Sequence, residues 1–171
     1  MKNIEVEIRS FISKEKYEEL IKFFKENSKF LHEEDQETYY FESDEDLRIF
    51  RTNSHSYILL KKGKIHDECR EEIELKFEKE KFEILEKLFL YLNFKIKAKW
   101  FRKRLEFNWN KVNVCLDNTK GYGYIIELEK MSTKNEKEKT LEILKQNLKK
   151  LNIDLTSKEE FQNKYEHYLK N

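Results

Sequence analysis

The chain has 171 residues, of which 38% are hydrophobic and 40% charged, and its 35 basic and 34 acidic side chains leave a formal net charge of +1. This balance excludes the strongly basic composition of a nonspecific nucleic-acid binder, and the hydrophobic residues are too numerous for a disordered chain. The length predicts one domain over residues 1–171. No apolar run approaches the roughly 18 residues of a membrane span, so we expect a cytoplasmic protein without a membrane partner.

Alternating apolar and polar residues, or runs rich in β-branched and aromatic residues, predict strands along most of the chain. The predicted strands are Ile4–Arg9, Thr38–Phe41, Asp46–Arg51, Ser56–Lys62, Arg70–Phe77, Lys97–Asn108, Lys111–Asp117 and Gly121–Glu129. Helical spacing predicts helices from the cap Ser13 to Asn27, over Lys79–Leu92, from a cap at Ser132 or Thr133 to Leu151, and over Ser157–Leu169. Helices do not separate every strand, so an antiparallel sheet or closed barrel fits better than a doubly wound parallel sheet.

Period-two geometry gives several predicted strands one charged or polar face and one apolar face. The polar faces hold Glu5, Glu7 and Arg9; Arg70, Glu72, Glu74 and Lys76; Arg102, Arg104 and Glu106; Asn113, Cys115 and Asp117; and Ile125, Glu127 and Glu129. An ordinary sheet with one face in water would alternate in the same way. Carboxylates two residues apart repel each other, however. Their spacing favours a barrel whose apolar face lies outside, under the helices, and whose charged face lies inside.

A charged interior has to be hydrated or filled by ions, because burying an unpaired charge costs several kcal/mol. Paired carboxylates bind a hard divalent cation such as Mg²⁺ through oxygen. Arginine and lysine bind phosphate oxygens, and arginine does so with two parallel hydrogen bonds. Acidic and basic side chains on facing walls therefore predict a site for a metal–polyphosphate complex.

Short motifs in a fixed order resemble those of the CYTH superfamily, the triphosphate tunnel metalloenzymes, and most of all its class IV adenylyl cyclases. The similar segments are Glu5–Arg9 (ExExK in the family), Leu47–Ile49 (LRIR), Lys62-Gly63 (Lys-Gly), Arg70–Glu74 (RxExE), Arg102–Arg104 with Phe107 (KxRxxY), Asp117 with Gly123, Glu127 and Glu129 (DxVxxLGxFxExE), and the tail Tyr165–Leu169. The resemblance covers nearly the whole chain, and the spacing of the last acidic motif is its most specific part.

The resemblance implies an α+β fold: an eight-stranded antiparallel β-barrel, or tunnel, with helices packed outside. It implies that Mg²⁺ or Mn²⁺ is bound by Glu5, Glu7, Asp117, Glu127 and Glu129. It assigns the substrate to Arg9, Arg48, Lys62, Arg70, Glu72, Arg102 and Arg104, and catalytic roles to Glu7 and Arg9. The protein would then catalyse the reaction mainly by positioning the triphosphate and neutralising its negative charge.

The leading hypothesis is a cyclase that converts ATP to cyclic AMP and pyrophosphate. The alternatives are a hydrolase of inorganic tripolyphosphate or thiamine triphosphate, and a noncatalytic protein that binds nucleotides or polyphosphate. The expected partner is thus ATP, tripolyphosphate or thiamine triphosphate, with no specific nucleic acid, and the sequence leaves a homodimer open.

The chain departs from the family at three places. Arg9 stands where the family has lysine, and arginine cannot accept a proton at neutral pH. Phe50 replaces the second arginine of LRIR, and Arg51 falls on the opposite face unless a bulge restores it. The region before Leu47 is shorter than in the cyclases.

Some assignments keep a structural alternative. Asp117 could begin a turn, and Arg102 and Arg104 could be surface cations. The choice of Lys62 over its neighbour Lys61 rests on the Lys-Gly match alone. Trp100 and Trp109 are expected to be packing residues.

Overall fold

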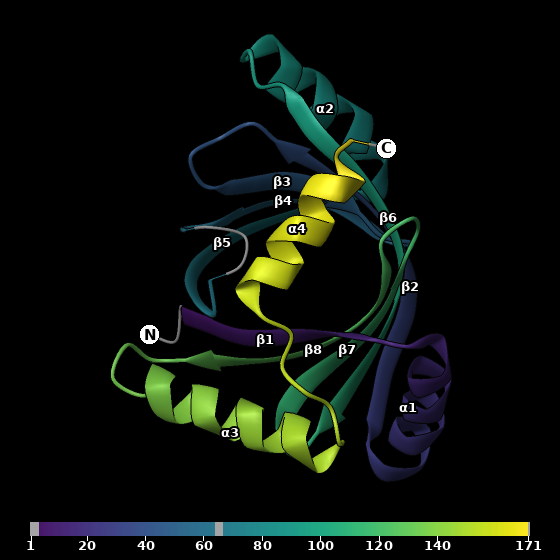
Figure 1. The fold of residues 1–171 in the computed structure, drawn as a ribbon. Helices are drawn as coiled ribbons and strands as arrows, with labels where there is room; N and C mark the ends of the chain where they lie inside the picture. Colours follow the sequence, from purple (N-terminus) through teal and green to yellow (C-terminus); the bar gives the residue numbers. More distant parts are fainter. Residues whose placement is uncertain (1–3, 64–66, 171) are drawn as a thin grey trace.

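The computed structural model describes residues 4–63 and 67–170. Among them, eight antiparallel strands close into a barrel in the order β1-β5-β4-β3-β2-β6-β7-β8 (Figure 1). The strands are β1 (Ile4–Ile12), β2 (Lys29–Phe41), β3 (Asp46–Arg51), β4 (His55–Lys61), β5 (Cys69–Glu78), β6 (Ile96–Trp109), β7 (Val112–Thr119) and β8 (Gly123–Ser132). The helices are α1 (Lys14–Asn27), the short 3₁₀ helix η1 (Lys79–Lys81), α2 (Phe82–Tyr91), α3 (Lys137–Lys150) and α4 (Lys158–Tyr168). The predicted α+β barrel is confirmed.

The alternation within each strand decides which side chains enter the barrel. In β1, Val6 and Ile8 point outward into an apolar core and are at most 2% exposed. Glu5 and Glu7 lie on the other face and line the cavity inside. The barrel is therefore apolar outside and charged inside, the reverse of a barrel filled by aliphatic side chains.

The larger apolar core lies between the outer face of the barrel and helices α1 and α3. Phe24 of α1 stacks on Phe107 of β6 with ring centroids 5.4 Å apart, and Leu144 and Leu148 of α3 belong to the same core. Burying a side chain of this size stabilises the fold by about 1.5–3 kcal/mol. Ser13 caps α1 as predicted, since its Oγ accepts a hydrogen bond from the backbone N–H of Lys16 at 3.1 Å.

Helix α2 covers a second part of the outer face, against β2 and β3. Its Phe82, Leu85 and Phe89 pack on the apolar residues Tyr39, Phe41 and Ile49. These contacts account for the helical spacing seen in the sequence, because residues three and four apart share one face of a helix. None of the helices in the described part of the chain is long and apolar enough to cross a membrane.

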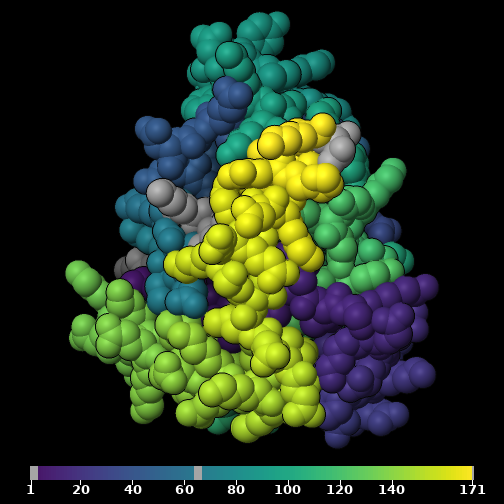
Figure 2. All heavy atoms as spheres, viewed as in Figure 1, coloured from purple at the N-terminus to yellow at the C-terminus, as the bar shows by residue number. Residues whose placement is uncertain are grey.

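Helix α4 lies across one end of the barrel (Figures 1 and 2). Its Tyr165 packs against Tyr40, Ala98 and Trp100, and the hydroxyl of Tyr168 donates to the carbonyl of Lys99 at 2.7 Å. Ser157 caps the helix through a 3.1 Å hydrogen bond from the N–H of Glu160 to its Oγ. The C-terminal helix thus covers this end of the barrel.

Three predicted element boundaries were wrong. Strand β2 begins at Lys29, and its first half escaped detection because its side chains are exposed on both faces, which erases the alternation. Strand β8 runs to Ser132 because it stays paired with β1 up to Ile4. Helix α3 consequently begins only at Lys137, so neither Ser132 nor Thr133 is its cap.

Candidate active site

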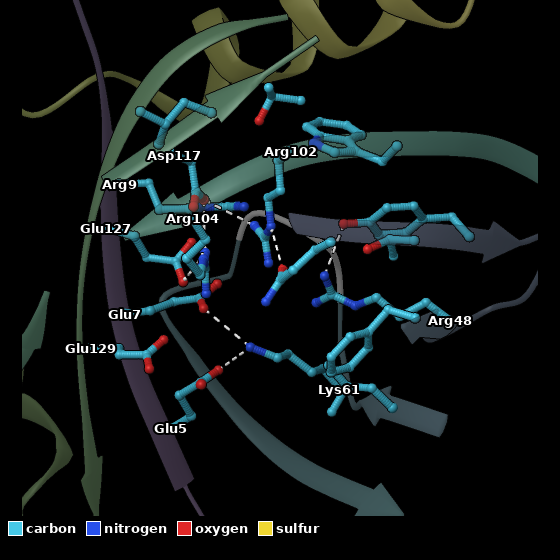
Figure 3. Close-up of a pocket in the computed structure, with 18 of the residues that line it drawn as sticks. Glu5, Glu7, Arg9, Arg48, Lys61, Arg102, Arg104, Asp117, Glu127 and Glu129 are labelled. Carbon is cyan, nitrogen blue, oxygen red and sulfur yellow. Dashed lines mark hydrogen bonds and ion pairs between the residues drawn. The ribbon is translucent and has the colours of Figure 1, made fainter. Parts of the chain in front are cut away.

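The inward faces of the strands line a cavity of about 170 Å³. Its walls carry charges of both signs (Figure 3). The charged lining residues are Glu5, Glu7, Arg9, Arg48, Lys61, Arg70, Glu72, Glu74, Arg102, Arg104, Asp117, Glu127 and Glu129.

Three carboxylates converge at one part of this wall. Oxygens of Glu5, Glu7 and Glu129 lie within 4.8 Å of one another. The antiparallel register sets Glu7 of β1 opposite Glu129 of β8, and alternation brings Glu5 to the same side. Lys61 of β4 reaches across the tunnel to them, donating to Glu5 and, at 3.2 Å, to Glu7. Its Nζ also lies 3.3 Å from Glu72.

Burial and neighbouring charges shift the pKa values of these three carboxyl groups in different directions. Burial raises the pKa of Glu5 to about 7 despite the attraction of Lys61. Burial, with the negative charges of Glu127 and Glu5, also raises the pKa of Glu129 well above its usual range. Burial acts on Glu7 in the same direction, but Lys61, Arg9 and Arg70 together outweigh it and lower the pKa of Glu7.

The donor set of this acidic cluster fits a hard divalent cation. It offers carboxylate oxygens from three side chains at mutual distances that one ion can span, and Mg²⁺ and Mn²⁺ prefer oxygen ligands. Burial is the main cause of the raised pKa values of Glu5 and Glu129, and neighbouring carboxylates add to it. The cluster therefore has the ligand atoms for a metal ion.

Asp46 joins two cations on the opposite wall. Its Oδ2 accepts from Arg70 at 2.7 Å and from Arg48 at 3.0 Å. Arg70 also donates to Glu7, and Arg48 donates to the hydroxyl of Tyr40 at 2.8 Å. Burial would raise the pKa of Asp46, but the attraction of Arg48 and Arg70 is stronger and lowers it. Asp46 thereby fixes two guanidinium groups that face the cavity.

A second cationic pair lies on β6. Arg104 binds the carboxylate of Asp117 through two hydrogen bonds and reaches Glu127 at 3.2 Å. Arg102 donates to Asp117 at 3.0 Å and to the side chain of Gln36 at 2.6 Å. Burial opposes ionisation of Glu127, but Arg104, Arg102 and Arg9 together outweigh it and lower its pKa to about 2. Glu127 is therefore ionised at neutral pH.

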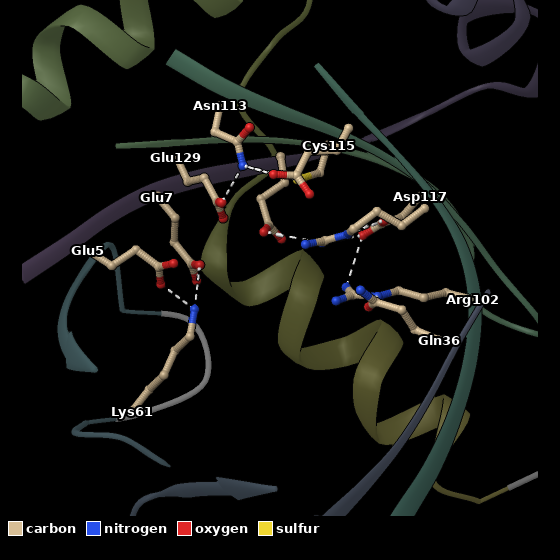
Figure 4. A network of polar contacts seen from close by, with 12 residues as sticks. Glu5, Glu7, Gln36, Lys61, Arg102, Asn113, Cys115, Asp117 and Glu129 are labelled. Carbon is tan, nitrogen blue, oxygen red and sulfur yellow. Dashed lines mark hydrogen bonds and ion pairs between the residues drawn. The ribbon is translucent and has the colours of Figure 1, made fainter. Parts of the chain in front are cut away.

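Beyond Glu129 the polar network continues toward the end of the tunnel remote from α4 (Figure 4). The amide of Asn113 donates to Glu129 at 2.7 Å and to Glu106 at 2.5 Å. The buried thiol of Cys115 lies beside them, and burial raises its pKa well above the usual range. His32 lies 3.0 Å from Glu106. The carboxylates at this end are thus held by an amide and an imidazole.

The sequence matches the family model of the CYTH domain over residues 3–161. The chain belongs to the CYTH domain family. A protein of Methanocaldococcus jannaschii is 37% identical over 163 residues, which cover 88% of this chain and 90% of that protein, and it bears the name "Putative adenylate cyclase".

Solved structures share the fold of this chain. A conserved hypothetical protein of Pyrococcus furiosus has a TM-score of 0.76 and 28% identity, over 88% of this chain and 91% of that one. An adenylyl cyclase homologue of Hippeastrum, described as having a dominant triphosphatase activity, has a TM-score of 0.60 and 20% identity over 91% of this chain and 92% of that one. At that identity the Hippeastrum protein shares the fold alone.

The structure brings nearly all of the expected CYTH motif residues to the same cavity, as Figure 3 shows for most of them. Glu5, Glu7, Glu127 and Glu129 face inward, and so do Arg48, Arg70, Glu72, Arg102, Arg104 and Asp117. Asp117 lies within β7 and begins no turn. Arg9 also lines the cavity, with its guanidinium carbon 5.2 Å from the centre of the Phe161 ring of α4.

Lys62 is the exception, and Lys61 takes the expected place. The side chain of Lys62 is 53% exposed and binds Glu71 outside the barrel at 2.9 Å. Lys61 is 6% exposed and faces the acidic cluster. The alternation of side chains along β4 could have identified Lys61 as the inward residue. Ile58 packs on the outer core, so the odd-numbered residues of this strand point inward.

No bulge restores the second arginine of LRIR. Strand β3 pairs in regular register with both β2 and β4, so Phe50 lines the cavity and Arg51 stays outside. There Arg51 binds Glu37 at 2.6 Å and Glu83 of α2 at 2.7 Å. The CYTH tunnel of this chain therefore has an aromatic ring in place of one cation.

Several residues of the site were missed by sequence reasoning. Asp46, which binds Arg48 and Arg70 behind the cavity wall, lies on the same face of β3 as Arg48 and could have been found from it. Trp100 lies on the same face of β6 as Arg102 and Arg104 and lines the cavity. Trp109 is a packing residue in the outer core, as expected. Gln36 lies in the first part of β2, ahead of the predicted strand, and Thr38 is the first residue of that predicted strand; both line the cavity.

Proposed function

We propose that this chain is a metal-dependent enzyme that processes a triphosphate inside the tunnel, with conversion of ATP to cyclic AMP and pyrophosphate as the leading reaction. The observation that carries the proposal is the meeting of cations from five strands, Arg9, Arg48, Lys61, Arg70, Arg102 and Arg104, beside a cluster of three carboxylates. The name of the Methanocaldococcus jannaschii relative supports the choice of reaction.

The cations would bind the phosphate oxygens. Arg48, Arg70, Arg102 and Arg104 are held by carboxylate, phenol or amide partners at 2.6–3.0 Å, so their guanidinium groups are oriented before a substrate arrives. Preorganised cations stabilise the charge that develops on transferring phosphoryl oxygens. In the cyclase reaction the 3′-hydroxyl loses its proton to solvent, its oxygen bonds to the α-phosphorus, and the bond from that phosphorus to the pyrophosphate oxygen breaks.

Glu5, Glu7 and Glu129 would hold the metal ion, with Glu127 and Asp117 nearby. A bound Mg²⁺ or Mn²⁺ would supply Lewis-acid polarisation of phosphate oxygens. Glu7 and Glu127 suit this task because their pKa values are lowered and they are ionised at neutral pH. Arg9 stays protonated, so its part is to neutralise phosphate charge and not to accept a proton.

Hydrolysis of a terminal phosphate is the second candidate, and the order of side chains along the tunnel favours it. From α4 inward, β1 presents Arg9, then Glu7, then Glu5, and β6 presents Trp100, Arg102, Arg104 and Glu106. A triphosphate whose organic group lies under α4 would point its terminal phosphate at the acidic cluster. Attack by water would then occur at the phosphate farthest from the organic group.

One assay separates these reactions. The protein is incubated with ATP, tripolyphosphate or thiamine triphosphate and with Mg²⁺ or Mn²⁺, and cyclic AMP, pyrophosphate and phosphate are measured. Cyclic AMP with pyrophosphate supports the cyclase. Release of phosphate supports the hydrolase, and tight binding without turnover supports a noncatalytic binding protein. If none of the three triphosphates binds, the proposed function is wrong.

A further inference from the structure

We propose that Asn113 selects the metal site of the tunnel. Its side-chain amide blocks a second group of potential metal ligands, and it thereby leaves the acidic cluster of Glu5, Glu7 and Glu129 as the place for the cation. This role rests on the metal ion of the proposed function and deepens it, because a residue outside the family motifs would decide where the cation binds and which cation is accepted.

Glu129 belongs to two groups of potential metal ligands in the described part of the chain. It completes the acidic cluster, and with Glu106 and Cys115 it forms a second group whose ligand atoms also lie within 4.8 Å of one another. Strand register produces this second group: Cys115 of β7 is the partner of Glu106 on β6, and Asn113, two residues earlier, is the partner of Glu129 on β8. The tunnel therefore offers ligands for more than one cation position.

The amide nitrogen of Asn113 contacts one atom of each member of the second group (Figure 4). Its Nδ2 lies 2.5 Å from Oε1 of Glu106, 2.7 Å from Oε1 of Glu129 and 3.9 Å from Sγ of Cys115. Ionised carboxylates only accept hydrogen bonds, so the NH₂ of the amide, and not its oxygen, has to face them. The amide group thus lies where a cation bound by these three side chains would lie.

Lys61 also donates to carboxylates of the tunnel, but it can leave them more easily than Asn113 can. Its ammonium reaches Glu5 and Glu7 from the end of a long flexible stem, so it can withdraw when a cation binds the acidic cluster. The amide of Asn113 has a short stem on a strand that is paired on both sides. A cation could enter the second group only if this amide rotated away from both of its carboxylate partners at once.

The two groups of ligands suit different cations. The acidic cluster offers only carboxylate oxygens, which suit Mg²⁺ and Mn²⁺, whereas the buried thiol of Cys115 adds a soft ligand that suits Zn²⁺ or its heavier analogue Cd²⁺. A thiophilic cation in the second group would also bind Glu129 and take this carboxylate from the acidic cluster. By blocking the second group, Asn113 keeps Glu129 available to the cation that prefers oxygen.

The test uses Cd²⁺, because a cadmium–thiolate bond absorbs in the ultraviolet and reports on the thiol directly. All proteins carry Cys69→Ser, which leaves Cys115 as the sole cysteine of the chain. In Asn113→Ala we expect the band to appear and to saturate with one Cd²⁺ per chain, as the thiol releases its proton to solvent and the Cd–S bond forms. With Asn113 intact, the absorbance at the same Cd²⁺ concentration should be less than about a tenth of this value. Asn118→Ala, at an exposed position of the same strand, is the matched control and should behave like the protein with Asn113.

Two further variants secure the result. Adding Cys115→Ser to Asn113→Ala should abolish the band. If Asn113→Ala does not fold, Asn113→Asp keeps the shape of the side chain without the donor hydrogens. It should show the band, and Cd²⁺ should raise its melting temperature more than that of the protein with Asn113.

Equal bands with and without Asn113, or no band in a folded variant that lacks it, would overturn this role of Asn113. Neither result involves a triphosphate, so neither bears on the proposed reaction. Calorimetry with Mn²⁺ separates the two ideas further. The protein with Asn113 intact should bind Mn²⁺ at the acidic cluster, and a failure to bind it would count against the proposed metal-dependent function.

Discussion

Arg104 donates two hydrogen bonds to the carboxylate of Asp117, from Nε at 2.8 Å and from Nη2 at 2.7 Å. The two residues are register partners on β6 and β7, and Asp117 is 2% exposed. Such a bidentate pair fixes the guanidinium plane. Asp117 thus fixes the orientation of the Arg104 guanidinium, for which we propose a phosphate-binding role.

Replacing Asp117 by asparagine should destabilise the fold by about 3 kcal/mol, because the buried Arg104 loses its main counter-charge. Urea denaturation measures this loss. Tripolyphosphate should raise the melting temperature of Asp117→Asn more than that of the wild type, since the ligand supplies the missing negative charge. Glu33→Gln is the control: it breaks an exposed pair with Lys103 and should cost less than about 1 kcal/mol. Equal ligand stabilisation of Asp117→Asn and wild type would contradict this role.

Glu127→Gln should abolish metal-dependent activity while the protein stays folded. The substitution keeps the shape of the side chain but removes a charge whose low pKa keeps it ionised. Activity would be followed with Mn²⁺, and folding by circular dichroism. Glu71→Gln offers a matched control, because Glu71 lies outside the barrel on Lys62. Full activity of Glu127→Gln would remove Glu127 from the site.

Lys61 and Lys62 should behave differently although they are neighbours. Lys61→Met leaves the carboxylates of Glu5, Glu7 and Glu72 without their shared cation, so we expect activity to fall about 100-fold and stability to drop. Mn²⁺ should restore part of that stability, because it replaces the lost positive charge. Lys62→Met should change neither quantity. Similar activity losses in the two variants would show that activity does not depend on the inward position of Lys61.

The contribution of Asp46 to stability should depend on pH in a defined direction. Its pKa is lowered in the folded protein, so its ion pairs stabilise the fold above the unfolded-state pKa of about 3.9, and this stability is lost as pH falls through the lowered folded pKa. At pH 7, Asp46→Asn should cost about 3 kcal/mol. Denaturation curves from pH 7 down to pH 3 should show that penalty shrinking only below about pH 4. Asp44→Asn, at an exposed position, should show no such trend.

The sequence by itself determined the two faces of the strands, because side chains alternate by covalent geometry whatever the tertiary structure. That local rule sufficed to group Glu5 with Glu7, Arg102 with Arg104, and Glu127 with Glu129. Helical spacing likewise identified the apolar faces that cover the barrel. The order of the family motifs then indicated closure into a tunnel.

Only the tertiary structure decided which groups meet across the tunnel. The register of β4 placed Lys61, not Lys62, on the acidic cluster, and that of β3 kept Phe50 inside and Arg51 outside. The partners of Asp46 come from β3 and β5, and Trp100 packs against Tyr165 of α4, a helix distant in sequence. These relationships depend on how strands far apart in the chain are aligned, which no local pattern encodes.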